Sequence, residues 1–228
     1  MVMTRMGLRP EVPRRFLDRR EAGRLLAARL QSYAGDDVVV LGLPRGGVPV
    51  AYEVAVALAA PLDVFMVRKL GAPGQEELAM GALASGGANI LNREVIAALH
   101  VSRDELRAVA DREFRELARR EHLYRDSRPY PALECKTVIL VDDGLATGAS
   151  MLVAAGALRR SHPAKLVVAV PVAPPEAGAQ LRECADEVIC FETPERFGGV
   201  GEWYEDFSQV SDDEVRALLN AAALRRLP

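Results

Sequence analysis

Blocks of apolar residues alternate with mixed blocks along this chain, and the pattern predicts a succession of strands and helices. Short, almost wholly apolar runs are typical of strands buried in a parallel sheet, and they occupy residues 36–43, 62–70, 136–143, 164–172 and 186–193. Runs with apolar residues at helical spacing lie before and between them, at residues 18–33, 48–60, 146–161 and 174–184. We therefore predict an α/β fold with a mostly parallel central sheet and helices on both faces.

Residues 71–128 interrupt this alternation, and we interpret them as a flap or insertion. Their first part, residues 71–92, is rich in glycine and small residues and carries two weak strand signals, ELAMGAL and ANIL. We expect a loop or a hairpin there. Residues 93–125 follow as helix with a break at residues 100–102, where Ser102 would cap the second piece. Opposite charges four residues apart in that piece indicate a solvated helix face.

The remaining organisation is that of one domain with appendages at its ends. We expect an N-terminal arm over residues 1–17 and a single domain over residues 18–228. The C-terminal tail of this domain, residues 192–228, ends in a predicted helix. Ser211 is the expected cap of that helix, because Glu214 follows three residues later in the spacing of a capping box.

Composition, charge and cysteine content narrow the class of protein. Half of the 228 residues are apolar and 27% are charged, an ordinary balance for a globular protein. The net charge of −3 gives no basic field for nucleic acid, and no apolar run reaches the ~18 to 20 residues of a membrane helix. Three cysteines without C-x-x-C spacing and three scattered histidines argue against disulfides and a zinc site. We expect a cytoplasmic protein with neither nucleic acid nor membrane as a partner.

The end of the apolar run at residues 136–143 carries the clearest candidate chemistry. Asp142 and Asp143 fall at the carboxyl end of this strand, where open α/β sheets bind ligands. The next helix is expected to begin near Thr147, and a helix start offers free N–H groups to an anion. Gly148 would allow close backbone approach. The acids would repel a phosphate but suit a sugar diol, so the loop could hold both ends of a sugar phosphate; alternatively, it is a simple N-cap turn.

The spacing of this loop excludes two common phosphate motifs and resembles a third. Gly144 and Gly148 lie one residue too close for a P-loop, no lysine follows, and G-x-G-x-x-G is absent. VILVDDGLATGAS, residues 138–150, resembles the phosphoribosyl-diphosphate (PRPP) motif of type I phosphoribosyltransferases: an apolar strand, two acids and a small-residue loop. That family usually has a larger apolar residue after the acids, and Gly144 departs from this pattern.

The resemblance implies the family's fold, with a small hood or flap, and roles for this loop. Asp142 and Asp143 would bind the ribose 2′ and 3′ hydroxyls and favour the positive charge that develops on the ribose during transfer. The loop would bind the 5′-phosphate through Ala146, Thr147, Gly148, Ala149 and Ser150. Mg²⁺ is the implied cofactor, held mainly by substrate oxygens, with Asp142 and Asp143 as its candidate protein ligands.

Two further segments occur in the order that the family has them. GLPRGGV, residues 42–48, is similar to the family's pyrophosphate loop, a turn that often contains a cis peptide, and Arg45, Gly46 and Gly47 would bind PRPP there. Arg68-Lys69 resembles a basic pair that also faces the pyrophosphate. For GLPRGGV, the alternative is a turn whose glycines are needed only for the backbone geometry. For Arg68-Lys69, the alternative is a solvated strand end.

The activity implied by the resemblance is transfer of the 5-phosphoribosyl group from PRPP to a nitrogen acceptor, with release of pyrophosphate. Hypoxanthine-type enzymes have an Asp where this chain has Ala146, so we reject that mechanism. Glu76 or Glu77 could protonate or hydrogen-bond a nucleobase-like acceptor, unless they form a surface turn. Trp203 and Tyr204 could stack on the acceptor, unless they pack the last helix onto the sheet.

Other functions are compatible with the same motif. A non-catalytic protein that senses PRPP or a nucleotide could have this fold, although no helix-turn-helix or basic face accompanies it here. A structural partner within a larger complex is a third reading. The resemblance covers residues 37–191, and it implies PRPP and a small-molecule acceptor as partners. Because dimers are common in the family, a homodimer is the expected assembly.

Overall fold

A five-stranded parallel sheet forms the centre of the computed structural model, which describes residues 15–35, 37–126 and 128–225. The strand order is β2-β1-β6-β7-β8. The strands are β1 Val38–Gly42, β2 Leu62–Val64, β6 Thr137–Val141, β7 Lys165–Val172 and β8 Glu187–Glu192. The parallel sheet predicted from the apolar runs is confirmed.

The register of β1 against β6 brings two loops of interest to one level. Val38 pairs with Thr137, and Gly42 pairs with Val141, so both strands end together. Because the strands are parallel, the loops that follow them emerge at the same edge of the sheet. This edge therefore receives both the segment after β1 and the two acids after β6.

Helices cover both faces of the central sheet, as predicted. They are α1 Arg19–Arg29 and α2 Gly47–Leu58 on one face and α5 Ala149–Arg159 and α6 Pro175–Leu181 on the other. Neighbouring strand residues supply opposite cores, since Val40 and Ile139 pack toward α1 and α2, whereas Leu41 and Leu140 pack toward α5 and α6. Burial on both faces explains why these strands are continuous apolar runs in the sequence.

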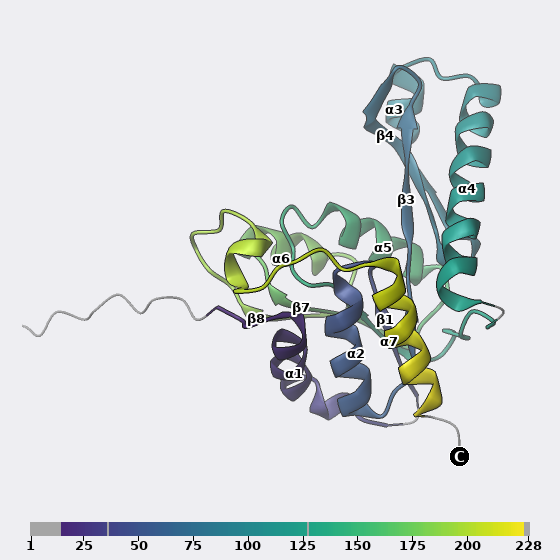
Figure 1. Ribbon diagram of the computed structural model, residues 1–228. Coiled ribbons are helices and arrows are strands. Elements are labelled where there is room, and N and C mark those ends of the chain that lie inside the picture. The colour runs from purple at the N-terminus through teal and green to yellow at the C-terminus, as the bar shows by residue number, and fades with distance from the viewer. Residues whose placement is uncertain (1–14, 36, 127, 226–228) are drawn as a thin grey trace, which may run out of the picture.

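Residues 67–125 form a flap that projects from the central sheet (Figure 1). Its elements are β3 Val67–Ala72, β4 Gln75–Ala84, the 3-10 turn η2 Ser85–Gly87, β5 Asn89–Leu91, α3 Arg93–Ala98 and α4 Arg103–Arg125. The strands form an antiparallel sheet in the order β3-β4-β5, so the segment expected as a loop or hairpin is a hairpin. Leu70 and Met80 of this sheet pack with Val109 of α4 in a small core of their own.

The single strand predicted over residues 62–70 is wrong, because the structure divides this run between two sheets. β2 ends at Val64 in the central sheet. Met66 then pairs with Ser85 at the base of the flap: the Ser85 N–H donates to the Met66 carbonyl and the Met66 N–H donates to Ser85 Oγ, both at 2.9 Å. Arg68 therefore lies inside β3 of the flap and not in a loop after a central strand.

The predicted helix break and both predicted serine caps are confirmed. Ser102 Oγ accepts the Glu105 N–H at 3.2 Å, and the Glu105 carboxylate accepts the Ser102 N–H at 2.9 Å, which completes a capping box at the start of α4. Ser211 Oγ accepts the Glu214 N–H at 3.1 Å at the start of α7, Asp212–Leu224.

The segment before α1 and the tail after β8 are joined to each other. The Phe16 N–H donates to the Trp203 carbonyl and the Glu205 N–H donates to the Phe16 carbonyl, both at 2.8 Å. Phe16 is only 1% exposed and packs with the domain, although it falls within the N-terminal arm expected over residues 1–17; residues 1–14 lie outside the described residues. The remaining short elements are the 3-10 turns η1 Gln31–Tyr33 and η3 Val200–Trp203. Within the described ranges, no helix is long and apolar enough to cross a membrane.

Candidate active site

The two motifs after β1 and β6 are in contact. A Cβ atom on Gly46 would lie 2.1 Å from Asp143 Oδ2, and one on Gly47 would lie 2.8 Å from the Asp142 Cα. Any side chain at these two positions would displace the acids or the backbone that carries them. Gly46 has φ −59° and ψ −35°, so glycine is required there for close approach and not for its backbone conformation. The Pro44–Arg45 peptide before them is cis.

The loop after the acids leads into α5 around a small hollow. Gly148 has a φ of +73°, which favours glycine, and α5 begins at Ala149, two residues after the expected start. A cavity of about 140 Å³ is lined by Asp142 and residues 144–151. All five residues expected to bind the 5′-phosphate line this cavity, at the positively polarised start of a helix.

The structure explains why position 144 is a glycine, where the resembling family usually has a larger apolar residue. A Cβ atom at this position would lie 2.6 Å from Val200 Cγ1 and 3.1 Å from Val172 Cγ1. Val200 belongs to η3 in the C-terminal tail. The apolar volume that a larger residue would supply is thus filled by Val200, from a part of the chain that the motif does not include.

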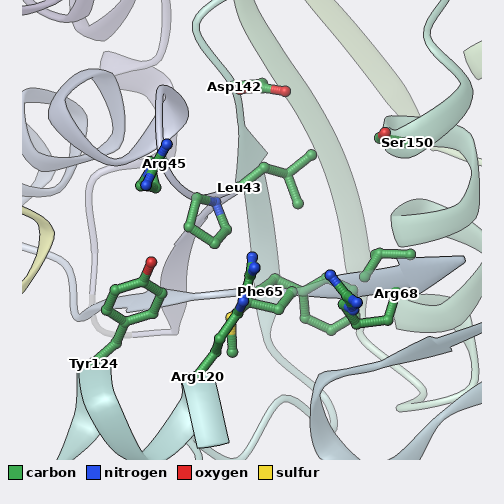
Figure 2. Close-up of a pocket in the computed structure, with 11 residues that line it drawn as sticks. Leu43, Arg45, Phe65, Arg68, Arg120, Tyr124, Asp142 and Ser150 are labelled. Carbon is green, nitrogen blue, oxygen red and sulfur yellow. The ribbon is translucent and has the colours of Figure 1, made fainter. Parts of the chain in front are cut away.

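A second cavity, of about 180 Å³, adjoins the first and shares Asp142 and Ser150 with it. Its lining residues are Leu43, Pro44, Arg45, Phe65, Met66, Val67, Arg68, Arg120, Tyr124, Asp142 and Ser150. Figure 2 shows Arg120 and Tyr124 on the α4 side, opposite Asp142. The three arginines come from the loop after β1, from β3 and from α4, and their combined charge suits a diphosphate.

Each arginine of this cavity also has a carboxylate partner. Arg45 Nη1 lies 3.8 Å from Asp212 Oδ1 at the start of α7. Arg68 Nη2 lies 2.5 Å from Glu113 Oε2. Arg120 Nε lies 2.7 Å from its helical neighbour Glu116. The Arg68 and Arg120 guanidinium groups are therefore held by hydrogen bonds, whereas Arg45 has only a longer ion pair, and a bound anion would share all three with these carboxylates.

Tyr124 adds a fixed hydroxyl to the same cavity. It donates to Asp212 Oδ1 at 2.5 Å. Burial and this hydrogen bond raise the pKa of Tyr124 to about 12, so the hydroxyl remains protonated at neutral pH. Because Asp212 also lies near Arg45, it ties α4 to the loop after β1.

The two acids have different surroundings. Burial and the neighbouring Asp143 carboxylate raise the pKa of Asp142 well above its usual range. Burial also raises the pKa of Asp143, but the Arg19 guanidinium opposes this effect, because Arg19 Nε lies 2.7 Å from Asp143 Oδ2. Perturbed acids at a strand end are typical of functional sites.

The structure does not bring all predicted site residues together. Lys69 lies on β3 and pairs with Glu77 at 3.1 Å, and neither these two residues nor Glu76 lines either cavity. Trp203 and Tyr204 are 7% and 3% exposed and pack beside Phe16 in a buried cluster. Neither ring is open for stacking on an acceptor, and both pack the tail against Phe16 and Val172 instead of packing the last helix onto the sheet.

Several residues of the site were missed by the sequence analysis. Arg19, Arg120, Tyr124 and Asp212 belong to helices whose sequence pattern indicates only an ordinary amphipathic or solvated face. Arg19 and Asp143 are 124 positions apart, and no local pattern marks such a pair. Tyr124 does stand out as an aromatic residue at the end of a charged helix, and that was the one available signal.

The donor groups present suit a magnesium ion that is shared with a substrate. Among the described residues, no group of three or more His, Cys, Asp or Glu side chains could hold a metal ion. Asp142 and Asp143 supply two carboxylates next to the arginine-lined cavity. Mg²⁺ is usually bound by one or two carboxylates together with substrate phosphates, so the pair fits this ion.

Comparisons with known proteins identify the family. A family model for the phosphoribosyl transferase domain matches residues 16–207. The "Putative phosphoribosyl transferase Rv0571c" of Mycobacterium tuberculosis H37Rv is 47% identical over 207 residues, which cover 91% of this chain and 47% of the relative. MT0597 of strain CDC 1551 gives the same values. The crystal structure of TT1426 from Thermus thermophilus has 46% identity and a TM-score of 0.79, and the alignment covers 90% of this chain and 97% of that one.

This chain belongs to the phosphoribosyl transferase family, and its fold is of the type I kind. The family predicted from the sequence is confirmed. The match extends beyond residues 37–191, because it includes Phe16 and the tail as far as Phe207. The chain spans about half the length of the curated relatives it matches.

Proposed function

We propose that this chain transfers the 5-phosphoribosyl group from PRPP to a nitrogen atom of a nucleobase-like acceptor. In this reaction the bond from ribose C1 to the diphosphate oxygen breaks, a bond from C1 to nitrogen forms, the proton on that nitrogen passes to a base or to water, and pyrophosphate leaves. One observation carries the proposal: the helix-start hollow and the arginine-lined cavity meet at Asp142 and Ser150. A molecule with a phosphate at one end, a diol in the middle and a diphosphate at the other matches this arrangement.

The residues take roles according to their place in the two cavities. The backbone N–H groups and hydroxyls of residues 146–150 would bind the 5′-phosphate at the start of α5. Asp142 and Asp143 would accept hydrogen bonds from the ribose hydroxyls and stabilise positive charge on the ribose. Arg45 and Arg68 would bind the diphosphate, next to the backbone of Gly46 and Gly47.

Mg²⁺ is the proposed cofactor, with Asp142 and Asp143 as its candidate protein ligands. When bound, it would neutralise charge on the diphosphate and so help this group to leave. The acid or base group stays a prediction: Glu76 and Glu77 are exposed on β4 and line neither cavity. The homodimer and the cytoplasmic location also stay predictions.

Calorimetric titration of PRPP with Mg²⁺ tests the proposal. Wild type should bind PRPP in the micromolar range, and the Asp142→Asn/Asp143→Asn variant should lose binding. The matched control is Asp104→Asn/Asp111→Asn, which removes the same charge from two exposed positions on α4 and should bind like wild type. Absence of PRPP binding by folded wild type would overturn the proposal.

Turnover then separates the enzyme from a PRPP sensor with the same fold. Nucleobases and other planar nitrogen heterocycles are supplied with PRPP and Mg²⁺, and released pyrophosphate is measured. An enzyme releases pyrophosphate with at least one acceptor, and the double Asn variant does not. Binding without pyrophosphate release for any acceptor would support the sensing alternative.

A further inference from the structure

Arg19 makes a buried contact with the second acid of the site. Its Nε donates to Asp143 Oδ2 at 2.7 Å, and the two side chains are only 11% and 14% exposed. The same oxygen also faces Gly46, whose absent side chain leaves room for it. The Tyr204 hydroxyl donates to the Asp143 backbone carbonyl at 2.5 Å. Asp143 is thus held by two separate parts of the chain, α1 and the C-terminal tail, and lies against a third, the loop after β1.

The C-terminal tail fixes the position of Arg19 itself. The guanidinium lies 4.0 Å from the centre of the Phe207 ring, and Arg19 Nη1 donates to the Ser208 carbonyl at 2.8 Å. The tail is fastened to the chain just before Arg19, since the Asp206 N–H donates to the Leu17 carbonyl at 3.0 Å. The guanidinium therefore has one defined orientation toward the acid.

Asp142 and Asp143 consequently differ in what they can contact. Asp142 lines both cavities, whereas Asp143 lines neither of them. One oxygen of Asp143 is used by Arg19, and the carboxylate can turn toward a ligand only as far as this ion pair allows. A carboxylate with a fixed partner has less freedom to lose when it binds a ligand.

We propose that Arg19 is a positioning residue for PRPP binding, which holds the Asp143 carboxylate in the orientation that a ribose hydroxyl or its Mg²⁺ requires. This proposal rests on the proposed function. It also assigns a role to the aromatic tail: Tyr204 and Phe207 support Arg19 and Asp143 from behind the site and do not stack on the acceptor. The N-terminal helix and the C-terminal tail are then both parts of the binding site.

Titration of PRPP with Mg²⁺ into variants of Arg19 tests the proposal. Arg19→Met should weaken binding by about tenfold or more, the scale on which outer partners of ligand groups act. Arg19→Lys should restore part of the affinity. The control is Arg20→Met, the next residue on α1, whose partner Glu53 lies 3.7 Å away and outside the site. It should bind PRPP like wild type.

A double-mutant cycle shows whether Arg19 acts through Asp143. If it does, Arg19→Met adds nothing to the loss already caused by Asp143→Asn. Phe207→Leu keeps the charge but removes the ring under the guanidinium, and should weaken binding about two- to fivefold, the scale of an exposed cation–π contact. This variant provides the test if Arg19→Met does not fold, which thermal unfolding reports.

The outcomes separate this proposal from the proposed function. If wild type binds PRPP, Asp143→Asn weakens binding and folded Arg19→Met binds like wild type, the positioning role is wrong and the proposed function stands. Independent, additive losses from Arg19→Met and Asp143→Asn would also overturn it, because Arg19 would then contact the ligand directly. If wild type does not bind PRPP, both proposals fail together.

Discussion

The central sheet and the flap contribute to the same cavity but are built differently. The sheet has two continuous apolar cores. Its loops fit so closely that Gly46 and Gly47 lie against Asp142 and Asp143, the two acids that follow the neighbouring strand β6. The flap has one small core of its own, shares a second core with α2, β2 and α7 at the base of α4, and has exposed ion pairs such as Glu116–Arg120 along its long helix. The difference indicates that the sheet edge supplies fixed geometry, and the flap supplies charge.

The division of the site follows this difference. Asp142, Ser150 and Arg45 come from loops and a helix start of the central sheet, whereas Arg68, Arg120 and Tyr124 come from the flap (Figures 1 and 2). Substrate contacts that need precise placement thus lie on the rigid part. The cavity depends on how the two parts are joined.

The junction between the flap and the central sheet depends on Arg125 at the end of α4. Its side chain is 7% exposed and lies 2.8 Å from Asp63 of β2 and 3.0 Å from Glu121, and it donates to the Val64 carbonyl at 2.7 Å. Arg125→Met would leave Asp63 buried without its cation. We expect a loss of about 3 to 5 kcal/mol in the free energy of unfolding, measured by urea denaturation.

The pH dependence of this loss is defined by Asp63. Burial raises its pKa and outweighs Arg125, so the folded protein holds a proton more tightly than the unfolded chain, and stability falls as pH rises above about 4. Without Arg125, the folded pKa rises further. The loss of unfolding free energy caused by Arg125→Met should therefore increase from about pH 4 to neutral pH. The control is Arg119→Met on the exposed face of α4, which should change stability little. A loss of unfolding free energy that decreases with rising pH would contradict this role of Asp63.

The sheet edge should tolerate no side chain at Gly47. An added Cβ would lie 2.8 Å from the Asp142 Cα and the Val141 carbonyl oxygen, and backbone atoms cannot turn aside. Gly47→Ala should cost about 1 to 3 kcal/mol of unfolding free energy and also weaken PRPP binding, because it displaces Asp142. Gly178→Ala is the matched control, since nothing lies within 4 Å of its Cβ position. It should be neutral or stabilising, as alanine is favoured in helices. Equal effects of both substitutions would show that the close approach does not matter.

The parts of the molecule that could be predicted from sequence are those with a local cause. Residues 136–143 and 164–172 were correctly predicted as buried strands. Both faces of these strands are covered, so their sequences are continuous apolar runs. Ser102 and Ser211 marked helix starts because a cap bonds only three residues ahead. The acids and the loop after them were found together because one strand and one helix start place them.

The features that were missed or wrong depend on distant contacts. The run at residues 62–70 looks like one strand, but pairing of Met66 with Ser85 moves its second half into the flap. Arg19 is unremarkable in its helix until the fold brings it to Asp143. Trp203 was a candidate for stacking until the tail was seen to pack on Phe16. Sequence patterns report the neighbours along an element and not those across the fold.

Two helix caps allow the flap and the sheet region to be compared with the same chemical change. Ser102→Ala removes the cap of α4, and Ser211→Ala removes the cap of α7, which packs with α2 and α4. Each should cost about 1 kcal/mol. In hydrogen exchange, Ser102→Ala should speed exchange in the first turn of α4 and leave α7 unchanged, because the start of α4 packs on the flap's own core and only its later turns pack with α7. Ser211→Ala should act on α7 and also on the cavity, since Asp212 follows the cap and bonds Tyr124. If Ser102→Ala instead speeds exchange throughout β1 and β6, the flap and the sheet unfold as one unit, and the contrast between them does not extend to their stability.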